Sequence, residues 1–206
     1  LTLLLIVAAG WEWSRLNGLA EGAARLVGLA LGGVLGVVWW QGGLARDLAT
    51  LWSATGVLWV ALGGWMLRRG VDGWRRWPAA ARLWGGLLLI AAAWLAMVQA
   101  RQLGLGFLLS ALTLVWMADV AAYFGGKAFG RRKLAPTISP GKSWEGVFSG
   151  RAGVLLLAAV WLWLDRQGLT DQPSLFSRLW ALGPWLAVPA ILFLSAMSVV
   201  GDLVES

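Results

Sequence analysis

Long apolar segments separated by short polar ones run through the whole chain. A bilayer core about 30 Å thick needs roughly 20 apolar residues in a helix. On this criterion the pattern predicts membrane-spanning helices at 1–13, 24–40, 49–67, 83–100, 103–124, 150–164 and 183–204. The expected fold is all-α, a polytopic transmembrane helical bundle of about seven spans that forms one domain over residues 1–206. Gly28, Gly32 and Gly36 share one helix face, which favours close helix packing in lipid.

Composition supports a membrane protein. Hydrophobic residues make up 59% of the 206 and charged residues 13%, whereas a soluble domain has about 25% charged residues. The 17 tryptophans are typical of helices that end where hydrocarbon meets lipid headgroups. Cysteine and histidine are absent, so a metal would need oxygen ligands, which favours Mg²⁺ over zinc.

The basic residues predict the orientation of the chain. Successive connections alternate sides, and one side carries 13 of the 17 basic residues. These are Arg15, Arg25, Arg68, Arg69, Arg75, Arg76, Arg82, Lys127, Arg131, Arg132, Lys133, Lys142 and Arg151. The other side carries Arg46, Arg101, Arg166 and Arg178. The positive-inside rule places the richer side in the cytoplasm. The net charge of +7 is read as this bias and not as nucleic-acid binding, because no groove-reading module is visible.

Asp119 is an acidic residue within the apolar run 107–124. A carboxylate in a membrane helix costs roughly 2.5–3.5 kcal/mol on insertion scales, so it is expected to face a polar cavity. Tyr123 follows four residues later and shares its helix face. The alternative is an acid that reaches the interface or caps a neighbouring helix.

The polar segment at about 125–150 is the candidate catalytic loop. It reads GGKAFGRRKLAPTISPGKSWEG from Gly125, and it combines glycines, which allow close approach of a ligand, with cations that neutralise phosphates. Ser139 and Pro140 have the form of a helix N-cap followed by Pro at the first helical position. That helix start would offer the N–H groups around Gly141, Lys142 and Ser143 to an anion. The alternative is a basic cluster that binds lipid headgroups.

The chain ends with two further acids, Asp202 and Glu205, in the segment 201–206. Their spacing puts both on one face of a continuing helix. With Asp119 and Glu145 on the same side of the membrane, four acids could share one site. Carboxylates bridged by metal suit phosphoryl and nucleotidyl transfer, although two interfacial acids in an ordinary loop are the alternative.

The stretch WMADVAAYFGGKAFGRRKLAPTISPGKSWEG, followed by SVVGDLVES, closely resembles bacterial phosphatidate cytidylyltransferases (CDP-diacylglycerol synthases). Trp11-Glu12-Trp13 fits the same family. The resemblance implies transfer of CMP from CTP to phosphatidic acid in phospholipid biosynthesis, with release of pyrophosphate. It also implies Mg²⁺, with or without a second cation, and an active site on the cytoplasmic side of the bacterial inner membrane.

The resemblance suggests individual roles. It implies that Asp202 is a metal ligand, and Glu205 is assigned beside it. Asp119, Lys133, Lys142 and Glu145 join Asp202 as catalytic candidates. The candidates for substrate binding are Tyr123, Lys127, Ser139, Pro140, Gly141 and Ser143. The partners expected are CTP, phosphatidic acid and membrane lipid, with no nucleic acid, and a homodimer is left open.

The family signature continues beyond the pattern seen here, with a Pro-Gly-His-Gly-Gly run and further aspartates that complete its metal site. The chain also starts without Met, so residues 1–206 are expected to be part of a longer protein and to be inactive alone. Two other functions stay open. One is a related CTP-dependent enzyme or kinase acting on another lipid or polyprenol, and the other is a membrane transporter.

Overall fold

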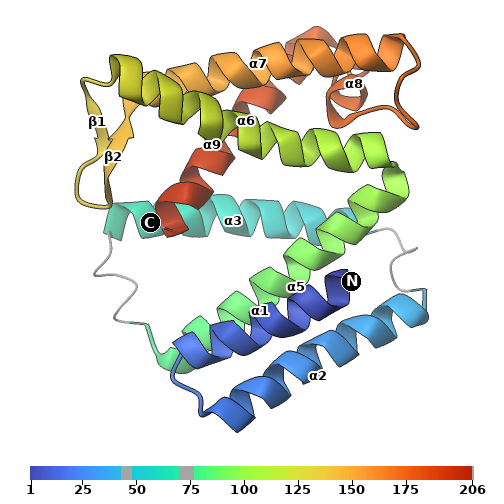
Figure 1. Ribbon diagram of the computed structural model, residues 1–206, viewed down its shortest axis with the longest axis vertical. Coiled ribbons are helices and arrows are strands. Elements are labelled where there is room, and N and C mark those ends of the chain that lie inside the picture. Colours follow the sequence, from blue (N-terminus) through green and yellow to red (C-terminus); the bar gives the residue numbers. More distant parts are fainter. Residues whose placement is uncertain (43–47, 70–76, 206) are drawn as a thin grey trace. The chain divides into compact units, whose positions relative to one another are not determined.

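The structure is a computed structural model that describes residues 1–42, 48–69 and 77–205. Arg46, Arg75 and Arg76, which entered the charge comparison, lie outside these residues. The elements in chain order are α1 (Thr2–Leu16), α2 (Glu21–Trp40), α3 (Ala49–Arg69), α5 (Ala79–Leu103), α6 (Leu105–Phe129), β1 (Lys133–Ala135), β2 (Ser139–Ser143), α7 (Trp144–Arg166), α8 (Leu175–Trp180) and α9 (Pro184–Glu205) (Figure 1).

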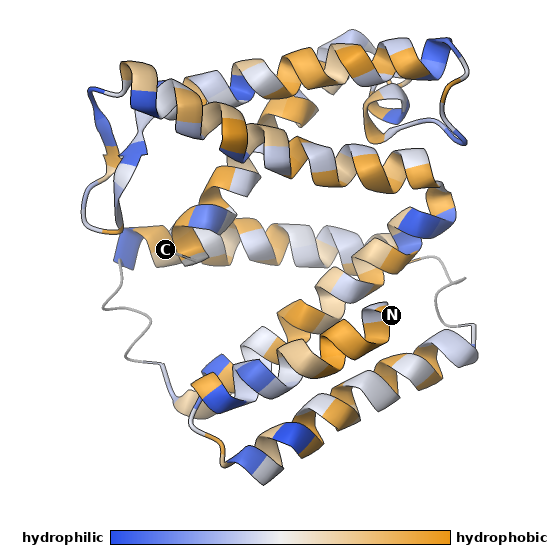
Figure 2. Ribbon diagram, in the orientation of Figure 1, coloured by the Kyte–Doolittle hydropathy of each residue, from blue (hydrophilic) through white to orange (hydrophobic). Residues whose placement is uncertain are grey.

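The prediction of an all-α polytopic bundle is confirmed. Six of the described helices, α2, α3, α5, α6, α7 and α9, are long and apolar enough to cross a membrane. The first predicted span corresponds to α1, which has 15 residues. Hydrophobic residues cover the helices, and hydrophilic residues gather at helix ends and in the β1–β2 segment (Figure 2). The chain is a multi-pass membrane protein.

The chain folds into two compact units, each made of segments that are separate in the sequence. The first unit comprises Leu1–Trp52 and Arg75–Gln99, and the second comprises Ser53–Trp74 and Ala100–Ser206. All the residues of the candidate site belong to the second unit.

In the first unit α1 packs closely on α2, and the predicted glycine face makes the contact. A Cβ on Gly28 would lie 2.5 Å from the carbonyl oxygen of Val7, and one on Gly32 would meet the Val7 side chain. The Trp13 indole Nε1 donates to the carbonyl oxygen of Leu83 at 3.1 Å and so ties α1 to α5. Ile6, Leu35 and Trp94 form the buried core of this unit.

In the second unit α6 and α7 pack against each other more extensively than any other pair of described elements. The helices approach closely because the contact positions on α7 are glycines. A Cβ on Gly146 would lie 2.8 Å from the carbonyl oxygen of Ala122, and one on Gly150 would lie 2.8 Å from that of Ala118. Small residues allow such backbone approach in membrane helices. The unit's buried core consists of Leu114, Ala118, Val154, Ala158, Phe176 and Ile191.

Asp171 fixes the start of α6. Its carboxylate oxygens accept hydrogen bonds from the backbone N–H groups of Leu105 and Gly106, both at 2.7 Å. These N–H groups belong to the first turn of α6, where no intrahelical acceptor exists. The same loop is held by Asp165, which accepts from the Ser174 hydroxyl at 2.6 Å and from the Thr170 hydroxyl at 2.7 Å.

We expect Gly150→Ala to destabilise the second unit, because the new methyl group would press on the Ala118 carbonyl and backbone cannot move aside cheaply. Gly56→Ala is the matched control, since a Cβ at Gly56 meets nothing within 4 Å. There the better helix propensity of Ala, worth about 1 kcal/mol, should leave stability unchanged or raised. Thermal unfolding in detergent, followed by tryptophan fluorescence, measures both variants. Equal or higher stability of Gly150→Ala relative to the control would contradict the packing described.

Asp171 also predicts a pH dependence. The N–H groups of Gly106 and Leu105 hold the pKa of the Asp171 carboxyl below its ordinary value of 3.8. A lowered pKa in the folded state means that the stabilisation is fully present above the unfolded pKa and is lost as pH falls through the folded one. Asp171→Asn should therefore unfold at a lower temperature than wild type at pH 7, and the difference should narrow as pH falls below 3.8. A difference that is independent of pH would exclude the carboxylate as its source.

Candidate active site

The predicted loop at 125–150 is shorter than expected and contains a strand pair. α6 extends to Phe129 and α7 begins at Trp144, so the connection covers 130–143. β1 and β2 pair antiparallel within it, with Lys133 opposite Ser143 and Ala135 opposite Ser139. Two strands are enough here because the connection joins neighbouring antiparallel helices and only needs to turn the chain around.

The prediction that a helix starts at Ser139 and Pro140 is wrong. Ser139 lies in β2, and Pro140 is tolerated there because a two-stranded ribbon has only edge strands. The N-cap of α7 is Ser143, whose hydroxyl oxygen accepts from the Gly146 N–H at 3.2 Å. The N–H groups of Gly141 and Lys142 therefore lie in a strand, and the anion site expected at a helix start there is not formed.

Glu145 holds the strand pair onto α7. Its carboxylate accepts from the backbone N–H groups of Arg131 and Arg132 at 3.1 and 3.2 Å. The Arg132 guanidinium lies 3.7 Å from the same carboxylate. The backbone N–H of Trp144 also donates to the Arg132 carbonyl at 3.0 Å. Glu145 thus fixes the position at which the chain leaves α6 and enters β1.

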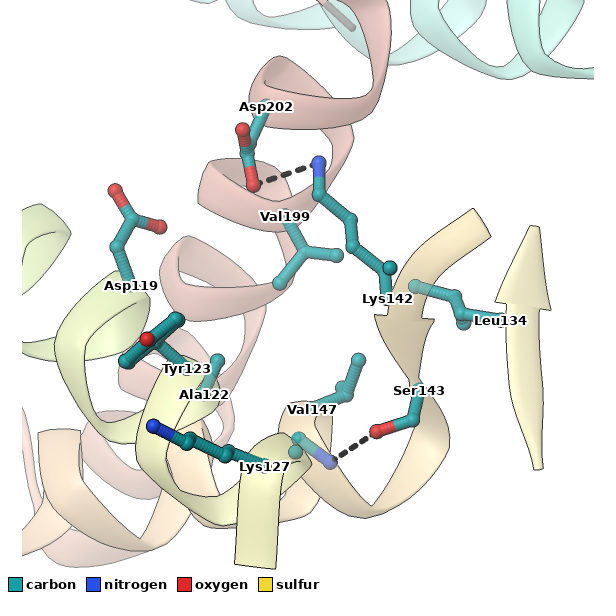
Figure 3. A pocket seen from close by; sticks show the side chains of 13 residues that line it. Asp119, Ala122, Tyr123, Lys127, Leu134, Lys142, Ser143, Val147, Val199 and Asp202 are labelled. Atoms are coloured by element: carbon teal, nitrogen blue, oxygen red, sulfur yellow. Dashed lines mark hydrogen bonds and ion pairs between the residues drawn. The ribbon is translucent and has the colours of Figure 1, made fainter. Parts of the chain in front are cut away.

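A pocket of about 380 Å³ lies where α6, the strand pair, α7 and α9 meet. This volume is in the range of small-molecule sites. Figure 3 shows the side chains that line it, with Asp119 and Tyr123 on α6, Lys142 on β2, and Val199 and Asp202 on α9. The full lining is Asp119, Ala122, Tyr123, Gly126, Lys127, Leu134, Gly141, Lys142, Ser143, Gly146, Val147, Val199 and Asp202.

The pocket joins Lys142 to Asp202, two residues that are far apart in the sequence. The Lys142 Nζ lies 2.6 Å from the Asp202 Oδ2 (Figure 3), and the Lys142 side chain is only 22% exposed. A charge-assisted contact of this length is stronger than a neutral hydrogen bond. The basic segment after α6 and the acidic end of α9 are therefore in direct contact.

Seven of the predicted site residues line the pocket. They are Asp119, Tyr123, Lys127, Gly141, Lys142, Ser143 and Asp202. Asp119 and Tyr123 both line the pocket, as their shared helix face predicts. Lys133, Ser139 and Pro140 are not among the lining residues.

The idea of one site with four acids is not supported for Glu145, whose carboxylate binds the backbone of the strand pair. The Glu205 side chain lies outside the described residues. Among the described residues no group of three or more acids could hold a metal ion. Asp119 and Asp202 are the acids that line the pocket.

Sequence reasoning missed the apolar part of the lining. Val199 precedes Asp202 by three residues on α9 and shares its helix face, and Val147 lies four residues after Ser143, the N-cap of α7. That spacing could have identified both. Leu134 could not be identified as a lining residue from sequence spacing, because the strand pair itself was not predicted.

Long apolar helices and a pocket lined by two lysines and two aspartates define the class of this protein, a multi-pass membrane protein with a charged pocket. The family model described as "Cytidylyltransferase family" matches residues 1–206. The chain belongs to this family.

Several curated relatives are named phosphatidate cytidylyltransferase. The protein of Pseudomonas aeruginosa is 40% identical over 159 residues, which cover 71% of this chain and 55% of the relative. The protein of Brucella melitensis is 30% identical over 96% of this chain and 58% of its own length. That of Haemophilus influenzae is 44% identical over 50% of this chain and 33% of its own. The chain thus spans a third to three fifths of these relatives, and no solved structure matches it.

We expect Glu145→Ala to release the strand pair from α7, because the N–H groups of Arg131 and Arg132 lose their acceptor. Hydrogen–deuterium exchange should become at least tenfold faster at these two amides. The Gly146 amide, bound to the Ser143 hydroxyl, is the internal control and should exchange at its wild-type rate. Unchanged exchange at Arg131 and Arg132 would show that Glu145 does not hold this segment.

Proposed function

We propose that the whole protein is a phosphatidate cytidylyltransferase, which makes CDP-diacylglycerol and pyrophosphate from CTP and phosphatidic acid. The observation that supports this proposal is the pocket lined by Lys127, Lys142, Asp119 and Asp202, where α6, α9 and the strand pair come together. Both substrates bring phosphate groups, and phosphatidic acid also brings acyl chains that stay in the bilayer. The names of the relatives support the same reaction.

In the proposed reaction a phosphate oxygen of phosphatidic acid attacks the α-phosphorus of CTP. A new P–O bond forms to the lipid phosphate, the bond from the α-phosphorus to the bridging oxygen breaks, and pyrophosphate leaves with that oxygen. Catalysis of such a transfer rests on positioning and charge neutralisation. Lys142 sits on the strand pair facing the cavity, where its ammonium group can neutralise the triphosphate.

Lys142 neutralises Asp202 in the structure, where the two groups lie 2.6 Å apart. Binding of a triphosphate offers the ammonium group a more strongly charged acceptor. We infer that Lys142 then moves from Asp202 to the nucleotide. The exchange leaves the Asp202 carboxylate available for another cation.

The residues present fit Mg²⁺ in part. This ion is usually held in nucleotide sites by one or two carboxylates together with substrate phosphates, and Asp202 already binds a cation, the Lys142 ammonium group. Asp202 would be its ligand in this chain. Bound there, Mg²⁺ would supply neutralising charge to the phosphates.

The side of the membrane also belongs to the proposal. The strand pair and the C-terminal end of α9 border the pocket, and the basic residues around them favour the cytoplasm. CTP is available in that compartment. We therefore place the active site on the cytoplasmic face of a bacterial inner membrane.

Asp202→Asn in the full-length protein should lower CDP-diacylglycerol formation by at least a hundredfold, because the amide neither pairs with Lys142 as an anion nor binds a cation well. Insertion and detergent-extracted yield should match wild type. Asp171→Asn, outside the pocket, is the matched control when assayed well below its unfolding temperature, and it should retain activity. Turnover of Asp202→Asn close to wild type would exclude Asp202 from the reaction.

A further inference from the structure

The two lysines of the pocket differ in their charge environment. The Lys142 ammonium group is paired with Asp202. None of the ion pairs among the described residues includes Lys127. Its Nζ instead lies 5.9 Å from the centre of the Tyr123 ring, as a cation–π contact. Lys127 therefore brings a positive charge to the cavity that no described carboxylate neutralises.

Lys127 stands at one end of an exposed apolar stripe on α6. Trp116, Val120 and Tyr123 precede it with helical spacings of four, three and four residues, so all four share one face. The three side chains are 61%, 52% and 63% exposed. Tyr123 and Lys127 also line the pocket, so the stripe continues directly from the cavity along the outside of the helix.

The length and depth of this stripe match one lipid leaflet. Lys127 lies in the last turn of α6, at the polar end of a candidate membrane span. The distance along the helix from Lys127 to Trp116 is about 16 Å at 1.5 Å per residue. Half of a bilayer's hydrocarbon core is about 15 Å. A lipid with its phosphate at Lys127 would thus have acyl chains that reach to Trp116.

We propose that Lys127 binds the phosphate of the lipid substrate, and that Trp116, Val120 and Tyr123 form the surface along which its acyl chains lie. This assignment rests on the proposed function and divides the pocket between the substrates. The lipid phosphomonoester binds on the α6 side, and the triphosphate binds at Lys142 on the strand pair. Charge complementarity supports this occupant over an ordinary membrane lipid, since a phosphomonoester carries more negative charge than a phosphodiester.

The C-terminal end of a helix favours a basic residue in any case, because the helix dipole is negative there. That effect requires charge alone and predicts a change in stability. A substrate contact predicts a change in KM for one substrate. The two roles are therefore separable by kinetics.

The test uses the full-length protein in mixed micelles, with CTP and phosphatidic acid varied independently. Lys127→Gln should raise KM for phosphatidic acid about tenfold, the size expected for loss of one charge-assisted contact, and should leave KM for CTP within twofold. Lys127→Arg, which keeps the charge, should restore most of the affinity. An increase confined to KM for CTP would assign Lys127 to the nucleotide and overturn the proposal, and so would unchanged values for both substrates.

The stripe is tested with a matched pair of substitutions. Val120→Trp should raise KM for long-chain phosphatidic acid and have less effect on a dihexanoyl substrate, because the bulky ring obstructs the path of the chains. Val160→Trp on α7 is the control, since Val160 is 51% exposed and lies outside the pocket. Equal effects of the two substitutions would overturn the acyl-chain assignment.

Two further experiments distinguish a specific lipid-phosphate site at Lys127 from general binding of anionic headgroups, and distinguish failure of this proposal from failure of the proposed function. Adding phosphatidylglycerol to the mixed micelles should leave the Lys127→Gln effect in place, and an effect abolished by this lipid would show that Lys127 binds anionic headgroups in general. Wild-type protein that transfers no CMP to phosphatidic acid would refute the proposed function itself. In that case Lys127→Gln should still weaken binding of phosphatidic acid in an equilibrium assay if the lipid site exists.

Discussion

The close approach of α6 and α7 is the constraint on which the candidate site depends. The carbonyl groups of Ala118 and Ala122 lie where any side chain on Gly150 or Gly146 would have to go. Because the backbones are so close, the connection between the helices can be a short strand pair. Glu145, at the start of α7, then binds the backbone at Arg131 and Arg132. The result is that Lys142 on β2 reaches Asp202 on α9.

The charged side chains of the pocket lie beside the packed helices α6 and α7, and the two lysines have different surroundings. Asp202 and Lys142 neutralise each other as an ion pair. Lys127 rests on the Tyr123 ring, beside an apolar surface that runs into the membrane. In the proposed reaction the site receives a water-soluble phosphate ligand from one direction and a lipid from the other. That property is what a membrane enzyme joining a nucleotide to a lipid requires.

Most of the long helices and several site residues could be predicted from the sequence, because a membrane-spanning helix requires a long apolar segment. The lengths of the apolar segments predicted the long helices. The charge pattern, the motif spacing and the family resemblance predicted that Asp119, Lys142 and Asp202 belong to one site. The local structure between α6 and α7 could not be predicted as well. Ser139-Pro140 and Ser143-Trp144 both resemble helix starts, and the choice between them depends on strand pairing with β1, a contact that local propensity does not contain. The role of Glu145 was misread for the same reason, since its carboxylate accepts from the backbone N–H groups of Arg131 and Arg132, just before β1.

The most direct measurement of the central claim follows two radioactive phosphates in parallel. Full-length protein in vesicles that contain phosphatidic acid is supplied with CTP labelled at the α-phosphorus in one sample and at the γ-phosphorus in the other. A cytidylyltransferase places the α-label in the lipid fraction and releases the γ-label as pyrophosphate, in equal amounts. Transfer of the γ-label to lipid would identify a kinase instead, and the absence of both labels from the lipid would contradict a CTP-dependent reaction on phosphatidic acid.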